Sequence, residues 1–158
     1  TSTGSRPVAA TTGAKIGTAA YWAERADAVR TTGLAPLTDT ILARWFSADF
    51  ATTYQAAYRG YANMLTRTPA EGYAATCDAL RDGDLRNEVA QIAVPTLVLC
   101  GEEDLATPPA LAQALAAAIP HACVGLIKQA GHMPSLEQPT SVAAAVRRFW
   151  EGVADAHG

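Results

Sequence analysis

The sequence is short of cysteine, of positive charge and of long apolar runs. Its three cysteines, Cys77, Cys100 and Cys123, are odd in number and have no Cys-x-x-Cys spacing, so we expect neither a disulfide framework nor a zinc site. Free cysteines fit a reducing cytoplasm. Only 12 basic residues face 15 acidic ones, which predicts no basic surface for nucleic acid. The longest apolar stretches, such as 114–119, are far too short to span a membrane.

What is present is enough for one folded domain. The 158 residues are 49% hydrophobic and 17% charged, which is typical of a globular chain with a core and argues against disorder. Residues 1–7 are small and polar, so we expect a flexible start, and they contain no secretory signal pattern. No metal or other cofactor is expected from any motif.

The chain divides near Val94. Before it, apolar residues recur at helical spacing, and start and stop signals predict helices at 19–30, 36–46, 54–65, 69–80 and 85–92. After it, an apolar run at 94–100, a helix ending near 119, a second strand at 122–128 and a closing helix at 139–153 follow one another. This order predicts an α/β fold in which two parallel strands are joined through a helix.

Asp104 and His132 are the strongest candidates for chemistry. Each follows a predicted strand, and functional residues of open parallel sheets gather in the loops beyond the carboxyl ends of the strands. A histidine that acts as a general base needs a buried acceptor that fixes its tautomer and stabilises the imidazolium. The competing interpretation is that Asp104 only caps the following helix and that His132 is an ordinary loop residue.

Two segments carry a resemblance. Val94-Pro-Thr-Leu-Val-Leu-Cys-Gly-Glu-Glu-Asp-Leu-Ala-Thr-Pro-Pro109 resembles the strand and acid loop of α/β-hydrolases, and Gly131-His-Met-Pro-Ser-Leu-Glu-Gln-Pro139 resembles their histidine loop. Three further segments are similar to 3-oxoadipate enol-lactonases of the protocatechuate branch of the β-ketoadipate pathway of aromatic catabolism. These segments are Thr12-Gly-Ala-Lys-Ile-Gly-Thr18, Arg44-Trp-Phe46 and Glu71-Gly-Tyr-Ala-Ala-Thr-Cys-Asp-Ala-Leu-Arg-Asp82.

The resemblance implies a division of the chain and a set of roles. Residues 1–18 would be a flexible start with a remnant strand, 19–92 a helical cap over the active site, and 93–158 the C-terminal part of the hydrolase core. Asp104 would orient His132, which would activate a serine for attack on a lactone or ester. Pro7 cannot donate to a strand ladder, so we expect the remnant strand to be frayed or absent.

The family's nucleophile motif, Gly-x-Ser-x-Gly, does not occur in these 158 residues. None of the serines falls in a predicted strand-to-helix turn; they are Ser2, Ser5, Ser47, Ser135 and Ser141. We therefore expect either a lactone hydrolase whose nucleophile an N-terminal hydrolase fragment supplies, or a non-catalytic binding or interaction protein that kept the acid and the histidine. A third option keeps the fold with another nucleophile. Exposed sheet edges carry unpaired backbone groups, so we expect the chain to pair with an N-terminal hydrolase fragment or to self-associate.

The remaining candidates are side chains in the helical part. Trp45 is a candidate for substrate binding, although an aromatic residue at helical spacing more often belongs to the core. Tyr54, Tyr58 and Tyr61 are expected to pack. Lys15 and Arg81 are candidates for a substrate carboxylate, but solvated or helix-pairing roles are favoured.

Overall fold

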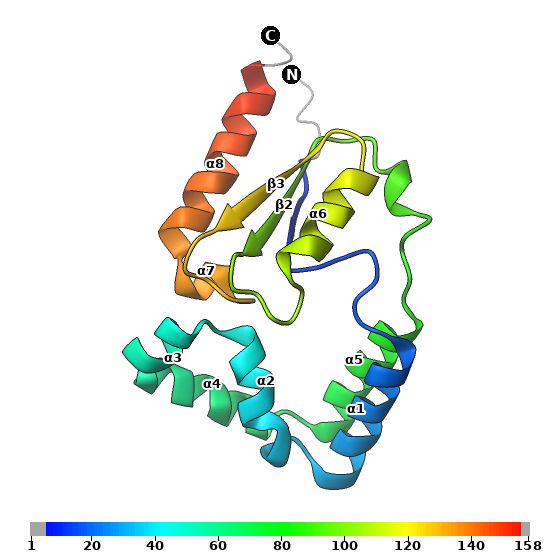
Figure 1. Cartoon of the computed structure of the whole chain (residues 1–158), viewed down its shortest axis with the longest axis vertical. Coiled ribbons are helices and arrows are strands. Elements are labelled where there is room, and N and C mark those ends of the chain that lie inside the picture. Colours follow the sequence, from blue (N-terminus) through cyan, green and yellow to red (C-terminus); the bar gives the residue numbers. More distant parts are fainter. Residues whose placement is uncertain (1–5, 156–158) are drawn as a thin grey trace.

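The computed structural model describes residues 6–155, with side chains to residue 152. Most of the start that the sequence predicts to be flexible lies outside this range. Within it, one small parallel sheet is flanked by helices, and further helices lie beyond one end of the sheet (Figure 1).

The sheet has three parallel strands in the order β1-β2-β3. They are β1 (Val8–Ala10), β2 (Thr96–Gly101) and β3 (Ala122–Ile127). The central strand β2 is buried at every position, as its mostly apolar run predicts for a strand covered on both faces. The predicted strand–helix–strand unit is confirmed.

The remnant strand that Pro7 was expected to fray or remove is present. β1 begins immediately after Pro7 and pairs with β2, with Val8 opposite Leu97. The missing N–H of Pro7 does no harm because the proline contributes through its carbonyl, which accepts from the N–H of Leu97 at 3.2 Å. The prediction of a frayed strand was therefore wrong.

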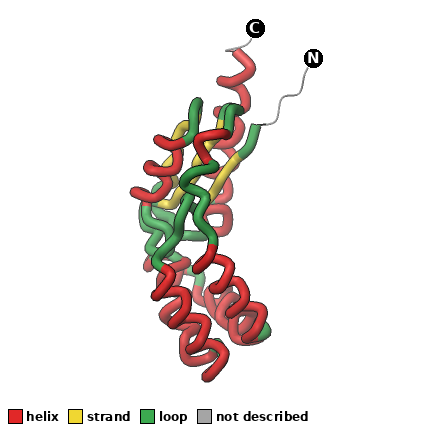
Figure 2. Tube along the Cα trace, turned by 90° about the vertical axis from the view of Figure 1, so that its right-hand side faces the viewer, coloured by secondary structure: helices red, strands yellow, loops and turns green. Residues whose placement is uncertain are grey.

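One helix covers each face of the sheet. Val98 and Cys100 of β2 pack with α6 (Pro109–Ala118) on one face, and Leu97 and Leu99 pack with α8 (Pro139–Asp155) on the other. The turned view in Figure 2 shows the strands between helices and the remaining helices gathered at one end of the sheet. That end is the carboxyl end of β2 and β3 (Figure 1).

The helical part has its own core. It consists of α1 (Ala19–Thr32), α2 (Thr38–Trp45), α3 (Ala48–Thr53), α4 (Gln55–Arg67) and α5 (Ala70–Asp82), with a 3-10 turn at Ala35–Leu37. Helices α1 and α5 lie side by side, and α4 packs on α2 and α3. Tyr58 and Tyr61 pack against Phe46 of the core as expected, whereas Tyr54 is 55% exposed.

Local signals set both ends of α1. Thr18 caps α1 by accepting from the N–H of Tyr21, and Gly33 ends it with φ of 73°, a conformation that favours glycine. Two short helices escaped prediction: α3, which Ser47 caps, and α7 (Pro134–Glu137). Both are too short to show helical periodicity.

The helix predicted at 85–92 is wrong. Only Val89–Gln91 forms a 3-10 turn. Asp84 accepts from the backbone N–H and the guanidinium of Arg86, and Leu85 donates to the carbonyl of Ala14. Most of the remaining backbone hydrogen bonds in this segment join residues three apart, as in turns: the N–H of Glu88 donates to the carbonyl of Leu85, and that of Gln91 to the carbonyl of Glu88.

Candidate active site

Asp104 follows β2 and is 1% exposed. Its Oδ1 accepts from the N–H groups of Ala106 and Thr107, each at 2.8 Å, and its Oδ2 accepts from the hydroxyl of Thr107 at 2.9 Å. A buried carboxylate needs such donors, because burial without them would be costly. The turn at 104–107 therefore fixes the carboxylate in one orientation.

His132 follows β3 and meets Asp104 across the sheet end. Its Nδ1 lies 2.9 Å from Oδ2 of Asp104 and 3.2 Å from the hydroxyl oxygen of Thr107. Burial raises the pKa of Asp104, but the hydrogen bonds from His132 and Thr107 outweigh it and hold that pKa below its usual value. The carboxylate is thus ionised near neutral pH and can only accept, which places the imidazole proton on Nδ1 and leaves the lone pair on Nε2.

The segments that carry Asp104 and His132 are in close backbone contact at Gly101. A Cβ on Gly101 would lie 2.1 Å from the carbonyl oxygen of Gly131 and 2.2 Å from that of Ala130, so no other residue fits there. Beside it, the N–H of Glu103 donates to the carbonyl of Ala130 at 2.9 Å. The close approach of the acid loop to the histidine loop sets the distance between Asp104 and His132.

A cavity of about 280 Å³ lies between this pair and the helices. His132 and Thr107 form part of its wall, and Trp22, Trp45 and Tyr73 form much of the rest. Trp45 also packs against the core of the helical part, and its role in substrate binding stays a prediction. The wall is mostly apolar, as expected where a small organic molecule binds.

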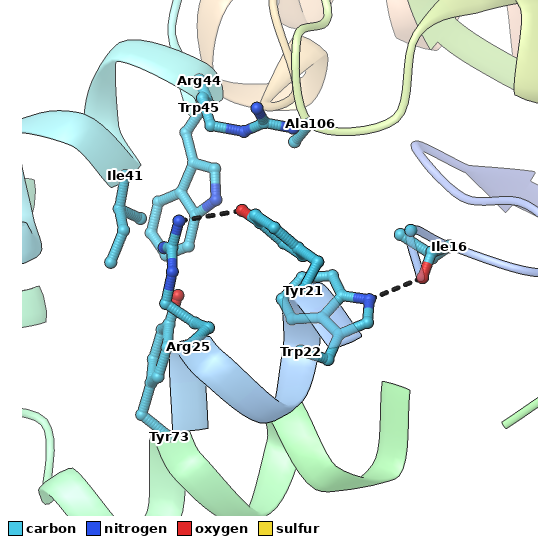
Figure 3. A pocket seen from close by; sticks show the side chains of 10 residues that line it. Ile16, Tyr21, Trp22, Arg25, Ile41, Arg44, Trp45, Tyr73 and Ala106 are labelled. Carbon is cyan, nitrogen blue, oxygen red and sulfur yellow. Dashed lines mark hydrogen bonds between the residues drawn. The ribbon is translucent and has the colours of Figure 1, made fainter. Parts of the chain in front are cut away.

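A smaller cavity of about 70 Å³ shares Trp22, Trp45 and Tyr73 with the first. Arg25 and Arg44 line it from α1 and α2 (Figure 3). Arg25 donates to the hydroxyl of Tyr21 at 2.8 Å. Among the side chains of residues 6–152, neither guanidinium forms a salt bridge with a carboxylate.

These arginines differ from the cations that the sequence singled out. Lys15 donates to three carbonyls at the end of α5, and Arg81 pairs with Asp78 and Asp82, so both have the helix-pairing roles that were favoured. Neither Arg25 nor Arg44 was among the candidates for a substrate carboxylate. For Arg25, the spacing of three residues from Trp22 on one helix was the available signal.

The sequence did not indicate two further residues near the Asp104–His132 pair. Thr107 bonds to both members of the pair, and Glu137 is a buried acid behind the histidine loop. Cys100 is buried beside Asp104 as a small core residue, and burial together with the nearby carboxylate raises the pKa of its thiol to about 11. Among the described residues, no cluster of His, Cys, Asp and Glu could hold a metal ion, and no helix has the length and apolarity to cross a membrane.

Comparison with known proteins places this fold and site in a class. The profile described as "Alpha/beta hydrolase family" matches residues 3–145. The chain therefore belongs to the alpha/beta hydrolase family.

Individual relatives narrow the similarity. The chain is 36% identical to 3-oxoadipate enol-lactonase 2 of Acinetobacter baylyi over 90% of its own length and 54% of that protein. The crystal structure of the enol-lactonase from Burkholderia xenovorans superposes with a TM-score of 0.87 at 35% identity, covering 92% of this chain and 56% of that one. An esterase from Thermogutta terrifontis gives 0.83 at 26% identity, covering 94% of this chain and 56% of that one. The chain thus spans about half the length of the relatives it matches.

Proposed function

We propose that this chain is the cap and C-terminal part of a hydrolase of the 3-oxoadipate enol-lactonase type, which opens lactones or esters by a Ser-His-Asp mechanism. The observation that carries the proposal is the buried bond of 2.9 Å between His132 Nδ1 and Asp104, placed on the wall of an apolar cavity. The similarity to two enol-lactonases supports the choice of reaction.

In this mechanism His132 is the general base and Asp104 the residue that orients it. With its proton on Nδ1, His132 would take the serine proton on Nε2 while the serine attacks the lactone carbonyl, and would then activate water for the second step. Asp104 would stabilise the imidazolium that forms in each step.

The serine would come from outside these 158 residues. Ser47 is buried and caps α3 by accepting from the N–H of Phe50, and Ser135 is exposed on α7. We propose that the part of the family that this chain does not match supplies the nucleophile. Within the described residues β1 pairs on one side only, so its other edge could accept a further strand.

The arginines beside the cavity fit the proposed substrate class. The enol-lactone of 3-oxoadipate has one carboxyl group closed into the ring and one free, so it presents an apolar ring and an anion. The ring would lie against Trp22, Trp45 and Tyr73, and the free carboxylate would meet Arg25 or Arg44. This substrate would place the chain in the β-ketoadipate pathway, and its free cysteines support a cytoplasmic location.

A non-catalytic binding protein is the alternative. The absence of Gly-x-Ser-x-Gly from the 158 residues favours it. The same cavity and arginines would then bind a small carboxylate without turning it over.

One experiment separates the two proposals. The purified chain is assayed for enol-lactone hydrolysis alone and after co-expression with the front segment of the Acinetobacter baylyi relative that it does not match, and intact mass establishes which chains are present. We expect hydrolysis only in the two-chain sample, and its loss in His132→Gln. His121→Gln, at an exposed position, is the matched control and should leave the rate unchanged. A stable two-chain complex that binds the lactone without hydrolysing it would favour the binding protein.

A further inference from the structure

Glu137 is a buried acid that joins two parts of the fold. It ends α7 and is 9% exposed. Its Oε1 accepts from the N–H of Gly131 at 2.8 Å, and its Oε2 accepts from the N–H of Ser47 at 2.9 Å. One carboxylate therefore holds the residue before His132 and the residue at the start of α3.

A second contact joins the same two segments. The N–H of Met133 donates to the carbonyl of Trp45 at 3.2 Å. A Cβ on Gly131 would lie 2.9 Å from both Ser47 N and Trp45 O, so here the two backbones lie against each other. His132 is thus the residue between two anchored neighbours.

The charge of Glu137 has no cation opposite it among the salt bridges of residues 6–155. The two backbone N–H groups are its partners, and hydrogen bonds to an ionised acceptor are stronger than neutral ones. A neutral side chain of similar size could not serve both donors equally, because an amide has only one oxygen.

We propose that Glu137 is a positioning residue that fixes the place of His132 relative to the cavity wall formed by Trp45. Ser47 and Trp45 lie two residues apart in the cap, and Gly131 and Met133 lie two residues apart around His132. The carboxylate therefore locks the histidine loop to the cap. The consequence for catalysis rests on the proposed function, but the lock itself does not.

The test uses the whole chain with Glu137→Gln, and Glu88→Gln at an exposed position as the matched control. In Glu137→Gln, amide exchange should speed up by about tenfold at Gly131 or at Ser47, whichever loses its acceptor oxygen, which corresponds to the loss of one buried hydrogen bond. The NMR signals of the His132 ring should shift as well. Glu88→Gln should change neither. A folded Glu137→Gln with unchanged exchange and unchanged ring signals would overturn the proposal.

Two further measurements test the lock if Glu137→Gln does not fold. If Glu137→Gln does not fold, Glu137→Asp, whose shorter side chain cannot reach both donors, is measured in the same way. In the wild-type chain, the amides of Gly131 and Ser47 should exchange at rates within about tenfold of each other, because one group holds both. Unrelated rates at the two amides would contradict the lock.

The activity assay then separates this proposal from the proposed function. In the two-chain sample, Glu137→Gln should lower kcat and shift the pH profile of kcat/KM, whereas a purely structural role would reduce only the amount of active protein. If Glu137→Gln alters exchange and ring signals but the wild-type chain shows no hydrolysis even in the two-chain sample, the proposed function is overturned and the lock stands.

Discussion

Replacing Asp104 with asparagine tests the central pair at one atom. The substitution keeps the size of the side chain but removes the charge and turns one of two acceptor oxygens into a donor. In the wild-type chain, Oδ1 of Asp104 accepts from two backbone N–H groups. Its Oδ2 accepts from the hydroxyl of Thr107 and lies 2.9 Å from Nδ1 of His132. The amide nitrogen has to occupy one of these two places.

The better place is that of Oδ2. Backbone N–H groups cannot become acceptors, whereas the hydroxyl of Thr107 can rotate and His132 can change tautomer. We therefore expect His132 to move its proton to Nε2 in Asp104→Asn. Because the four bonds lose their charge assistance, the free energy of unfolding should fall by about 2–4 kcal/mol. Hydrolysis in the two-chain sample should fall on the order of 10³–10⁴-fold, because the wrong nitrogen carries the proton.

Two measurements follow this change. The ¹⁵N shifts of the His132 ring report the tautomer, and urea unfolding reports the stability. The pH dependence adds a check of sign: the pKa of Asp104 is lowered by folding, so its contribution is complete above the unfolded value of about 3.9 and is lost as pH falls through the folded pKa. The gap in stability between wild type and variant should therefore shrink in acid.

The reasoning would be refuted by a folded Asp104→Asn whose His132 still carries its proton on Nδ1. Equal free energies of unfolding for the wild type and Asp104→Asn near neutral pH would refute the estimated contribution of these hydrogen bonds to stability. Thr107→Val is a useful companion, because it removes the hydroxyl but leaves both oxygens of Asp104. It should weaken stability without changing the tautomer.

Three other predictions concern the surroundings of the pair. Gly131→Ala should destabilise the chain by about 1–3 kcal/mol in urea unfolding, because its Cβ meets cap backbone, whereas Gly72→Ala, with open space around it on a helix, should be neutral or stabilising. Arg25→Gln should raise KM for a lactone that carries a carboxylate and leave KM for an uncharged ester unchanged; equal effects on both would count against an anion site. A thiol reagent should modify exposed Cys123 first and Cys100 only on unfolding, since burial raises the pKa of the Cys100 thiol to about 11; mass spectrometry of the labelled chain decides this.

Short stretches of the sequence were enough to predict much of the fold. The run at 94–100 predicts a strand covered on both faces, because it is mostly apolar and does not alternate polar with apolar positions. Thr18 and Gly33 mark the two ends of α1 through their own hydrogen bonding and backbone freedom. The order of strands then predicts that Asp104 and His132 share one end of the sheet.

Contacts between distant segments decided the rest. Pro7 stands before a real strand because β2 provides a partner for its carbonyl. Residues 85–92 form only turns, and the N–H of Leu85 is bonded to the distant carbonyl of Ala14. Arg25 and Arg44 come together only through the packing of separate helices.

Sequence alone determined the pair of loops that bear the acid and the histidine, because residue type and strand ends are local properties. Only the tertiary structure showed that Thr107 bonds to both members of the pair and that Glu137 joins the histidine loop to the cap. The bond from Glu137 to Ser47 crosses 90 positions of the chain. No pattern of neighbouring residues records such a bond, because it exists only once both segments have been folded against each other.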